Sequence, residues 1–161
     1  MPFTFRPAVE ADISAFLTWC YEPPYEVYNL DTEDTDKLVR YFLDPQIHCT
    51  AVTDESGELV AYCTFGPDGQ VPGGNYADPA LGIGLGVCPD LTGQGRGLGY
   101  VSAVLEFARR TFAPPALRVT VAAFNVRALR VWERAGFRRV QTFERRPDGM
   151  PFVVLQTSPD L

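Results

Sequence analysis

Apolar side chains in the first half of the chain recur at helical spacing in two places. Between residues 9 and 20 they recur at intervals of three and four, which predicts a helix with one apolar face. The side chains on this face are Ile13, Phe16, Leu17 and Cys20. A second helix is predicted over 35–43, and it ends before Pro45 because a residue that precedes proline disfavours the α conformation.

Alternating or β-branched runs predict the strands. A short first strand is expected at 3–5, and the segments 47–53 and 58–65 are expected to form an antiparallel hairpin around the turn sequence Asp-Glu-Ser-Gly. Later strands are expected at 80–87, 117–121, 137–145 and 151–157.

Two further helices are predicted between the later strands. One carries apolar positions from Leu98 to Phe112 and ends at the sequence Ala-Pro-Pro. For the other, Asn125 is an N-cap candidate and Gly136 a C-terminal stop. The resulting order β-α-α-β-β-β-α-β-α-β-β predicts an α/β fold with a mixed sheet and helices on its faces. We expect the 161 residues to form one domain, 1–161, because no repeat or linker is visible.

Composition and charge narrow the class of protein. The net charge of −6 makes a nucleic-acid partner unexpected. No apolar run is long enough to cross a membrane and no signal pattern opens the chain, so a cytoplasmic protein without membrane contact is expected. Four cysteines without a CxxC pair and a single histidine predict no metal site. Arginines gather late in the chain, either as a local anion-attracting patch or as a solvated face.

A cluster of six glycines between Gly84 and Gly99 separates a predicted strand from a predicted helix. Glycine weakens both kinds of element, so the cluster indicates that the backbone itself has a role there. The first N–H groups of a helix have no intrahelical partners, and glycines let the oxygens of a phosphate or pyrophosphate reach them. The spacing fits neither the Walker loop nor the dinucleotide-binding fingerprint.

A third glycine pattern fits this segment better than the Walker loop or the dinucleotide-binding fingerprint. The segment QGRGLG, residues 94–99, matches Q/R-x-x-G-x-G/A and follows LGVCPDLTG. The later segment NVRALRVWERAGF, residues 125–137, is similar to N-x-x-A-x-x-x-Y-x-x-x-G-F, with Trp132 in the tyrosine position. Together with the element order, these motifs resemble the GNAT N-acyltransferase superfamily over essentially the whole chain. The resemblance implies a mostly antiparallel sheet with helices on both faces and a splayed pair of parallel strands.

The resemblance also implies how acetyl-CoA, the expected co-substrate, would be held. The pyrophosphate would accept hydrogen bonds from the loop amides, and the pantetheine arm would pair with the preceding strand. Asn125 would lie near the arm, and we expect Trp132 to pack beside it without transferring protons, because an indole has no useful acidity. The loop residues are Gln94, Gly95, Arg96, Gly97, Leu98 and Gly99, and the strand residues are Leu85, Gly86 and Val87.

The resemblance implies an acceptor site that is flanked by the loop before the central strand, by the last strands and by the segment that joins the first two helices. Here this segment holds Tyr21, Glu22, Tyr25 and Tyr28, a set that suits a cationic amine. Glu22 is the first candidate for the catalytic base and Asp78 the second. The implied reaction is direct attack of a primary amine on the thioester, with a small molecule, a protein N-terminus or a lysine as acceptor. An acyl-CoA-binding sensor with little turnover is the alternative, and a homodimer is possible.

Overall fold

The computed structural model describes residues 3–157, which fall into two compact units. The first unit contains the described residues up to Thr64 together with Leu85–Gln94. The second contains Phe65–Gly84 and the described residues from Gly95 onward. Strand β4, Leu81–Val87, contributes to both. The expectation of one domain over 1–161 stays a prediction.

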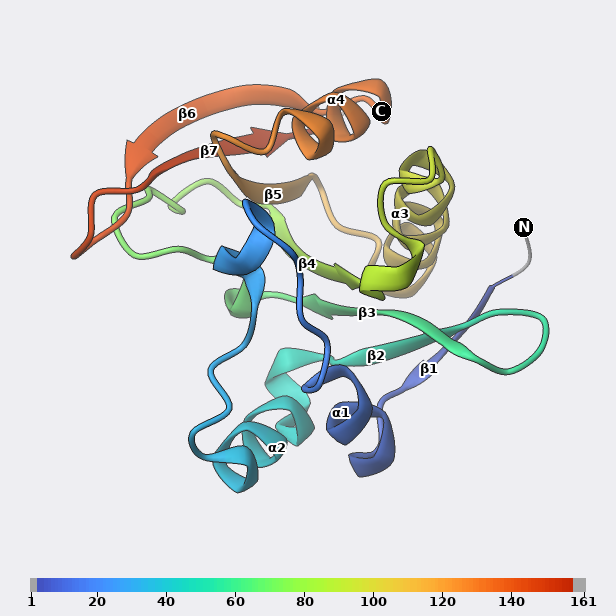
Figure 1. Cartoon of the computed structure of the whole chain (residues 1–161). Coiled ribbons are helices and arrows are strands. Elements are labelled where there is room, and N and C mark those ends of the chain that lie inside the picture. Colours follow the sequence, from blue (N-terminus) through green and yellow to red (C-terminus); the bar gives the residue numbers. More distant parts are fainter. Residues whose placement is uncertain (1–2, 158–161) are drawn as a thin grey trace. The chain divides into compact units, whose positions relative to one another are not determined.

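Seven strands and four α-helices occur in the described residues, in the predicted order (Figure 1). Within residues 3–157, four short 3-10 helices lie between them, and three of these begin at a proline. Besides β4, the helices and strands are β1 (Thr4–Pro7), α1 (Glu10–Phe16), α2 (Thr35–Leu43), β2 (Thr50–Thr53), β3 (Leu59–Phe65), α3 (Gly97–Phe112), β5 (Leu117–Ala122), α4 (Val126–Arg134), β6 (Arg138–Glu144) and β7 (Pro151–Gln156).

The first helix ends earlier than its apolar spacing predicts. Instead of continuing to Cys20, α1 stops at Phe16, and Cys20 is exposed. The chain tightens after this point, because the N–H groups of Thr18 and Trp19 donate to carbonyl oxygens only three residues earlier. The hydroxyl of Thr18 also donates to the Ala15 carbonyl at 2.6 Å, which draws the chain away from the helix axis.

In the first unit, β1, β2, β3 and the end of β4 lie side by side in that order, and β1–β2 and β2–β3 are antiparallel. Helices α1 and α2 lie next to each other (Figure 1). The ring of Phe16 packs edge-on against Phe42 and stacks on Tyr62 at 3.8 Å between centroids. These rings belong to a buried apolar cluster that also contains Ile13, Leu17 and Ile47.

In the second unit the strand order is the start of β4, then β5, β7 and β6. The β4–β5 pair is parallel, whereas β5–β7 and β6–β7 are antiparallel. This confirms the prediction of a mixed, mostly antiparallel sheet with one parallel pair. Helix α3 buries one face, and its residues Tyr100, Val101, Val104, Leu105 and Ala108 are almost fully covered.

Candidate functional site

The predicted phosphate loop lies between β4 and α3, as its sequence indicates. Pro89–Leu91 forms a 3-10 turn after β4, and α3 begins at Gly97. Between them, Gly93 and Gly95 have φ angles of 73° and 74°, which other residues adopt only with strain. The side-chain amide of Gln94 donates to the Asp90 carbonyl at 2.8 Å. Glycine is therefore required by the path of the loop at two of its positions.

The two glycines in the first turn of α3 differ in their surroundings. A Cβ at Gly97 would lie 3.2 Å from Cγ2 of Val131 on α4, so close packing of the two helices requires a small residue there. A Cβ at Gly99 would meet no atom within 4 Å. Internal packing therefore explains Gly97, whereas Gly99 leaves an open surface beside the start of the helix.

The N-terminus of α3 is organised around Arg96, its N-cap residue. The Arg96 carbonyl accepts hydrogen bonds from the N–H groups of Gly99 at 3.1 Å and Tyr100 at 3.3 Å. The Arg96 guanidinium lies 5.9 Å from the centre of the Tyr100 ring. This cation lies where the helix dipole is positive, so both favour an anion at the same helix end.

The later motif forms α4 and its N-cap. Asn125 is almost fully buried, and its side-chain oxygen accepts from the N–H of Ala128 at 3.1 Å, which confirms the predicted cap. Trp132 is 5% exposed and packs edge-on against Phe137, with 5.0 Å between ring centres. The indole thus occupies the core in the position where the motif has tyrosine.

Strand β4 is shaped by its neighbours on both sides. A Cβ at Gly86 would lie 2.7 Å from Cζ of Tyr62, so the glycine makes room for this ring. In the second unit, the parallel register with β5 runs from Leu81–Leu117 to Ile83–Val119. The next β5 residue, Thr120, instead forms a hydrogen bond of 2.9 Å between its hydroxyl and that of Tyr76. The parallel pairing described for this unit therefore covers the first half of β4.

Tyr21 is brought to the end of β4 from the segment after α1. Its hydroxyl donates to the Val87 carbonyl at 2.7 Å, and its N–H donates to the side-chain oxygen of Asn29 at 2.7 Å. Burial, with a smaller contribution from Cys88, raises the pKa of Tyr21 to about 12. The structure thus unites one predicted acceptor-binding residue with one predicted pantetheine-binding residue.

The other acceptor candidates lie near Tyr21 in sequence. A 3-10 helix begins at Tyr25 and ends at Tyr28, and the Tyr25 N–H donates to the Glu22 carbonyl at 2.8 Å. The side chain of Glu22 is exposed. Asp78 is exposed as well and lies in the second unit. Their roles as base or binding residues stay predictions.

No pattern in the sequence indicated a buried cation beside Asp78. Arg118 on β5 is 5% exposed, and its guanidinium donates to the carbonyls of Asp78 at 3.0 Å and Ala80 at 3.4 Å. Its guanidinium carbon lies 4.9 Å from the centre of the Tyr76 ring. Within residues 3–157, Nε of Arg118 is the buried side-chain polar atom without a hydrogen-bond partner. Arg118 therefore holds the segment that leads into β4.

Two further properties bear on the class of site. Among residues 3–157, no three histidine, cysteine, aspartate or glutamate side chains gather in a way that would hold a metal ion. None of the helices described for this chain has the length and apolar character needed to cross a membrane.

Solved structures of similar fold are acetyltransferases. A spermidine N-acetyltransferase chimera from Vibrio cholerae and hSSAT has a TM-score of 0.79 at 15% identity, covering 99% of this chain and 97% of that chain. A GNAT-family acetyltransferase from Bacillus anthracis has a TM-score of 0.76 at 16% identity, covering 100% and 97%. Aminoglycoside acetyltransferase AAC(6')-Ib in complex with coenzyme A has a TM-score of 0.75 at 21% identity, covering 98% and 95%.

Sequence comparison gives the family. No curated protein matches the chain significantly. The family model for the acetyltransferase (GNAT) domain matches residues 3–138, which is most of the sequence. The order of elements, the glycine loop before α3 and the Asn125 helix agree with this match. The chain is therefore a member of the GNAT acetyltransferase family.

Proposed function

We propose that the protein transfers the acetyl group of acetyl-CoA to a primary amine by direct attack of the amine on the thioester. The observation that carries this proposal is the loop from Gln94 to Gly99 at the start of α3 in a GNAT-family chain. Spermidine and aminoglycosides, which appear in the names of structural neighbours, are both amines.

The residues present suit a diphosphate. The early N–H groups of α3 and the loop amides from Gln94 onward would donate to it, and Arg96 would add a charge-assisted bond. The open surface beside Gly99 leaves space for the ligand, whereas any side chain at Gly95 would strain the loop. Acetyl-CoA, when bound, would supply the acetyl group as an activated thioester.

The strand before the loop would hold the pantetheine arm through the backbone of Leu85, Gly86 and Val87. Because Tyr21 already donates to the Val87 carbonyl, the N–H groups of this segment are the more useful ones for the arm and for the thioester oxygen. Tyr21 would thus fix the position of the backbone donors. Asn125, the N-cap of α4, and Trp132 stay further candidates for contact with acetyl-CoA, although Trp132 is buried against Phe137.

The amine must lose a proton before it attacks. Glu22, next to Tyr21 and in the turn that contains Tyr25, is our first choice for the base, and Asp78 is the second. Both side chains are exposed, so protons would move from the site to solvent directly or through water. Tyr28 would complete the aromatic side of the acceptor site.

An acyl-CoA-binding sensor with little turnover is the second candidate function. It is favoured by Trp132, which is buried against Phe137 and cannot protonate a leaving thiolate. The third candidate function has the same chemistry: acetylation of protein N-termini or lysines.

A thiol-release assay with acetyl-CoA and a panel of amines, polyamines, amino acids and peptides tests the proposal. We expect release that depends on the amine, together with an acetylated product identified by mass spectrometry. Binding of acetyl-CoA without amine-dependent release would favour the sensor. For the base, Glu22→Gln is expected to remove the acidic limb of the pH–rate profile, with Glu26→Gln as the matched control on the same segment. An unchanged profile in Glu22→Gln, with a changed one in Asp78→Asn, would assign the base to Asp78.

A further inference from the structure

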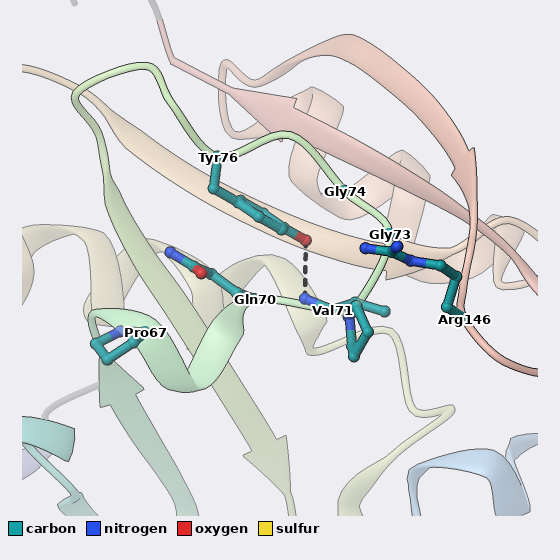
Figure 2. A pocket seen from close by; sticks show the side chains of 8 residues that line it. Pro67, Gln70, Val71, Gly73, Gly74, Tyr76 and Arg146 are labelled. Carbon is teal, nitrogen blue, oxygen red and sulfur yellow. Dashed lines mark hydrogen bonds between the residues drawn. The ribbon is translucent and has the colours of Figure 1, made fainter.

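The arginines late in the chain differ in their surroundings. Arg118 is buried on β5 and donates to backbone carbonyls, and Arg145 forms an ion pair with Asp148. Figure 2 shows Arg146 beside a pocket that Tyr76 also lines. Each of these arginines thus contacts another part of the second unit or lines a cavity in it.

Helix α4 carries a different set of arginines along one side. Arg127, Arg130 and Arg134 are spaced by three and four residues, so they are neighbours on the helix surface. All three are exposed, and we call them the arginine stripe. Glu133, the acidic residue of α4, does not compensate them, because it pairs with Arg139 on β6 at 3.1 Å.

Two cations of the arginine stripe have no partner in the part of the chain that the structure describes. Within residues 3–157, Arg130 and Arg134 form neither an ion pair nor a side-chain hydrogen bond. Like charges four residues apart destabilise a helix slightly. The whole chain has a net charge of −6, so this local positive charge is not a consequence of average composition. The stripe therefore suits an anion that comes from outside the fold.

The stripe lies next to the first turn of α3. A Cβ at Gly97 would lie 3.2 Å from Cγ2 of Val131, and Figure 1 shows the two helices side by side. Arg134 follows Val131 by one helical turn, and helical side chains lean toward the N-terminus of their own helix. This direction takes the Arg134 side chain toward the contact between α4 and α3. Both helices, and the loop from Gly95 onward, belong to the second unit.

We propose that the arginine stripe binds the 3′-phosphate of coenzyme A, with Arg134 as the residue that selects a cofactor carrying this group. Coenzyme A has a diphosphate and, on the adjoining ribose, a phosphate monoester. With the diphosphate at the amides of Gly95 to Gly99, the monoester is one sugar ring away, and α4 is in contact with this end of α3. The monoester carries about two negative charges at neutral pH. A guanidinium can donate two parallel hydrogen bonds to it.

This inference rests on the proposed function and adds a specificity to it. Arg96, the N-cap of α3, is adjacent to the amides proposed for the diphosphate, whereas the stripe would hold a different phosphate. The pantetheine arm and the diphosphate are the same in coenzyme A and in its 3′-dephospho form. The stripe would therefore distinguish these two cofactors, which the glycine loop alone does not.

The test compares acetyl-CoA with its 3′-dephospho form, which lacks the monoester alone. By titration calorimetry, we expect the wild type to bind acetyl-CoA about tenfold more tightly. Arg134→Gln should lower this preference to about threefold, with unchanged affinity for the dephospho form, and the double variant with Arg130→Gln should remove it. Arg134→Lys keeps the charge without the paired donors and should give an intermediate preference.

The matched control is Arg109→Gln, which removes the same charge from the same unit. Arg109 is exposed in the last turn of α3, about 18 Å along the helix from Gly97. We expect this variant to keep the wild-type preference. A preference that falls equally in Arg109→Gln and Arg134→Gln would reflect the overall charge and would overturn the assignment to the stripe.

The outcomes separate the stripe from the proposed function. Equal affinities of the wild type for the two compounds would overturn the stripe, whose arginines would then be only solvated, and would leave the acetyl transfer standing. Equal losses for both compounds in Arg134→Gln would also overturn it. A preference that depends on Arg134 supports the stripe even where no amine-dependent thiol release is found, a result that would count against the acetyl transfer alone.

Discussion

The hydroxyl of Tyr21 donates a hydrogen bond of 2.7 Å to the carbonyl of Val87, at the end of β4. The two residues are 66 positions apart in the sequence. The bond ties the segment that holds the acceptor candidates to the strand that we propose for the pantetheine arm. It therefore couples the position of one proposed substrate site to the other within the first unit.

The Tyr21→Phe variant tests this coupling. Loss of the hydroxyl leaves the Val87 carbonyl without its donor, so we expect a loss of about 1 kcal/mol in unfolding free energy. The catalytic efficiency should fall by about tenfold, because the backbone donors of β4 are less well fixed. Thermal unfolding and steady-state kinetics measure the two effects, and Tyr41→Phe on the exposed side of α2 is the control. Full activity in Tyr21→Phe would mean that the bond is structural only.

Tyr21 also gives a pH dependence of defined sign. Because burial raises its pKa to about 12, the folded protein keeps the phenol proton at pH values where the unfolded chain has lost it. Its contribution to stability is therefore complete below about pH 10, the usual tyrosine value, and is lost as the pH rises toward 12. Between these pH values, the free energy of unfolding measured with urea should fall more steeply for the wild type than for Tyr21→Phe. Parallel curves would contradict the shift.

The element order could be read from the sequence because each element carries its own local signal. Helix α2 has the predicted bounds, since an apolar face leads up to a clear stop at Pro45. Helix α1 lacks such a stop, and its end is set by hydrogen bonds of Thr18 that apolar spacing does not reveal. The Asn125 cap was predictable for the same local reason.

Some features of the candidate site could likewise be predicted from local sequence, and others could not. The loop of Gln94–Gly99 follows from glycine spacing, whereas the Tyr21–Val87 bond depends on a contact between segments far apart in the chain. The need for glycine at 86 depends likewise on the ring of Tyr62. Sequence patterns do not show which side chain faces a given glycine.

Gly86→Ala tests the packing of β4 against the aromatic cluster of the first unit. A methyl group there would overlap the ring of Tyr62, which is stacked on Phe16, so we expect destabilisation of about 1–3 kcal/mol. Urea unfolding measures the change. In a double variant with Tyr62→Val the overlap is gone, and the cost of Gly86→Ala should largely disappear. A cost that is the same in both backgrounds would rule out Tyr62 as its cause.

Gly99→Ala should have opposite effects on stability and binding. The new methyl group meets no protein atom, and alanine favours a helix by up to about 1 kcal/mol over glycine, so the folded protein should become more stable. The same group would occupy the space that we propose for the diphosphate, and affinity for acetyl-CoA should fall by about tenfold, or about 1.4 kcal/mol. Unchanged affinity in a more stable protein would place the ligand elsewhere.

Asp12 accepts hydrogen bonds at the start of α1 and makes the stability of the folded protein depend on pH in the acidic range. Hydrogen bonds from Arg6, together with the Val9 N–H, hold the pKa of this carboxyl below its usual value. Its contribution is therefore complete above about pH 4 and is lost as the pH falls through the lowered pKa. Asp12→Asn should cost about 1–3 kcal/mol at neutral pH and flatten the acid limb of the unfolding curve. Asp148→Asn, in the exposed pair with Arg145, is the control and should change stability less.

The Trp132→Phe variant tests whether the side chain at the motif's tyrosine position takes part in the reaction. The indole is buried against Phe137, so the variant should lose some stability but keep most of kcat, because no proton passes through this side chain. Steady-state kinetics with a saturating amine measures kcat. A thousandfold loss in a folded variant would show that Trp132 takes part in the reaction.

Binding of the coenzyme A diphosphate by the backbone amides from Gln94 to Gly99 is the proposal on which the others depend. Titration calorimetry with acetyl-CoA and with acetyl-pantetheine, which lacks the diphosphate and the adenosine part attached to it, tests this binding. We expect one acetyl-CoA bound per chain and an affinity for acetyl-pantetheine that is weaker by tenfold or more, about 1.4 kcal/mol at least. Equal affinities for the two compounds, or no binding of acetyl-CoA by the folded protein, would contradict it.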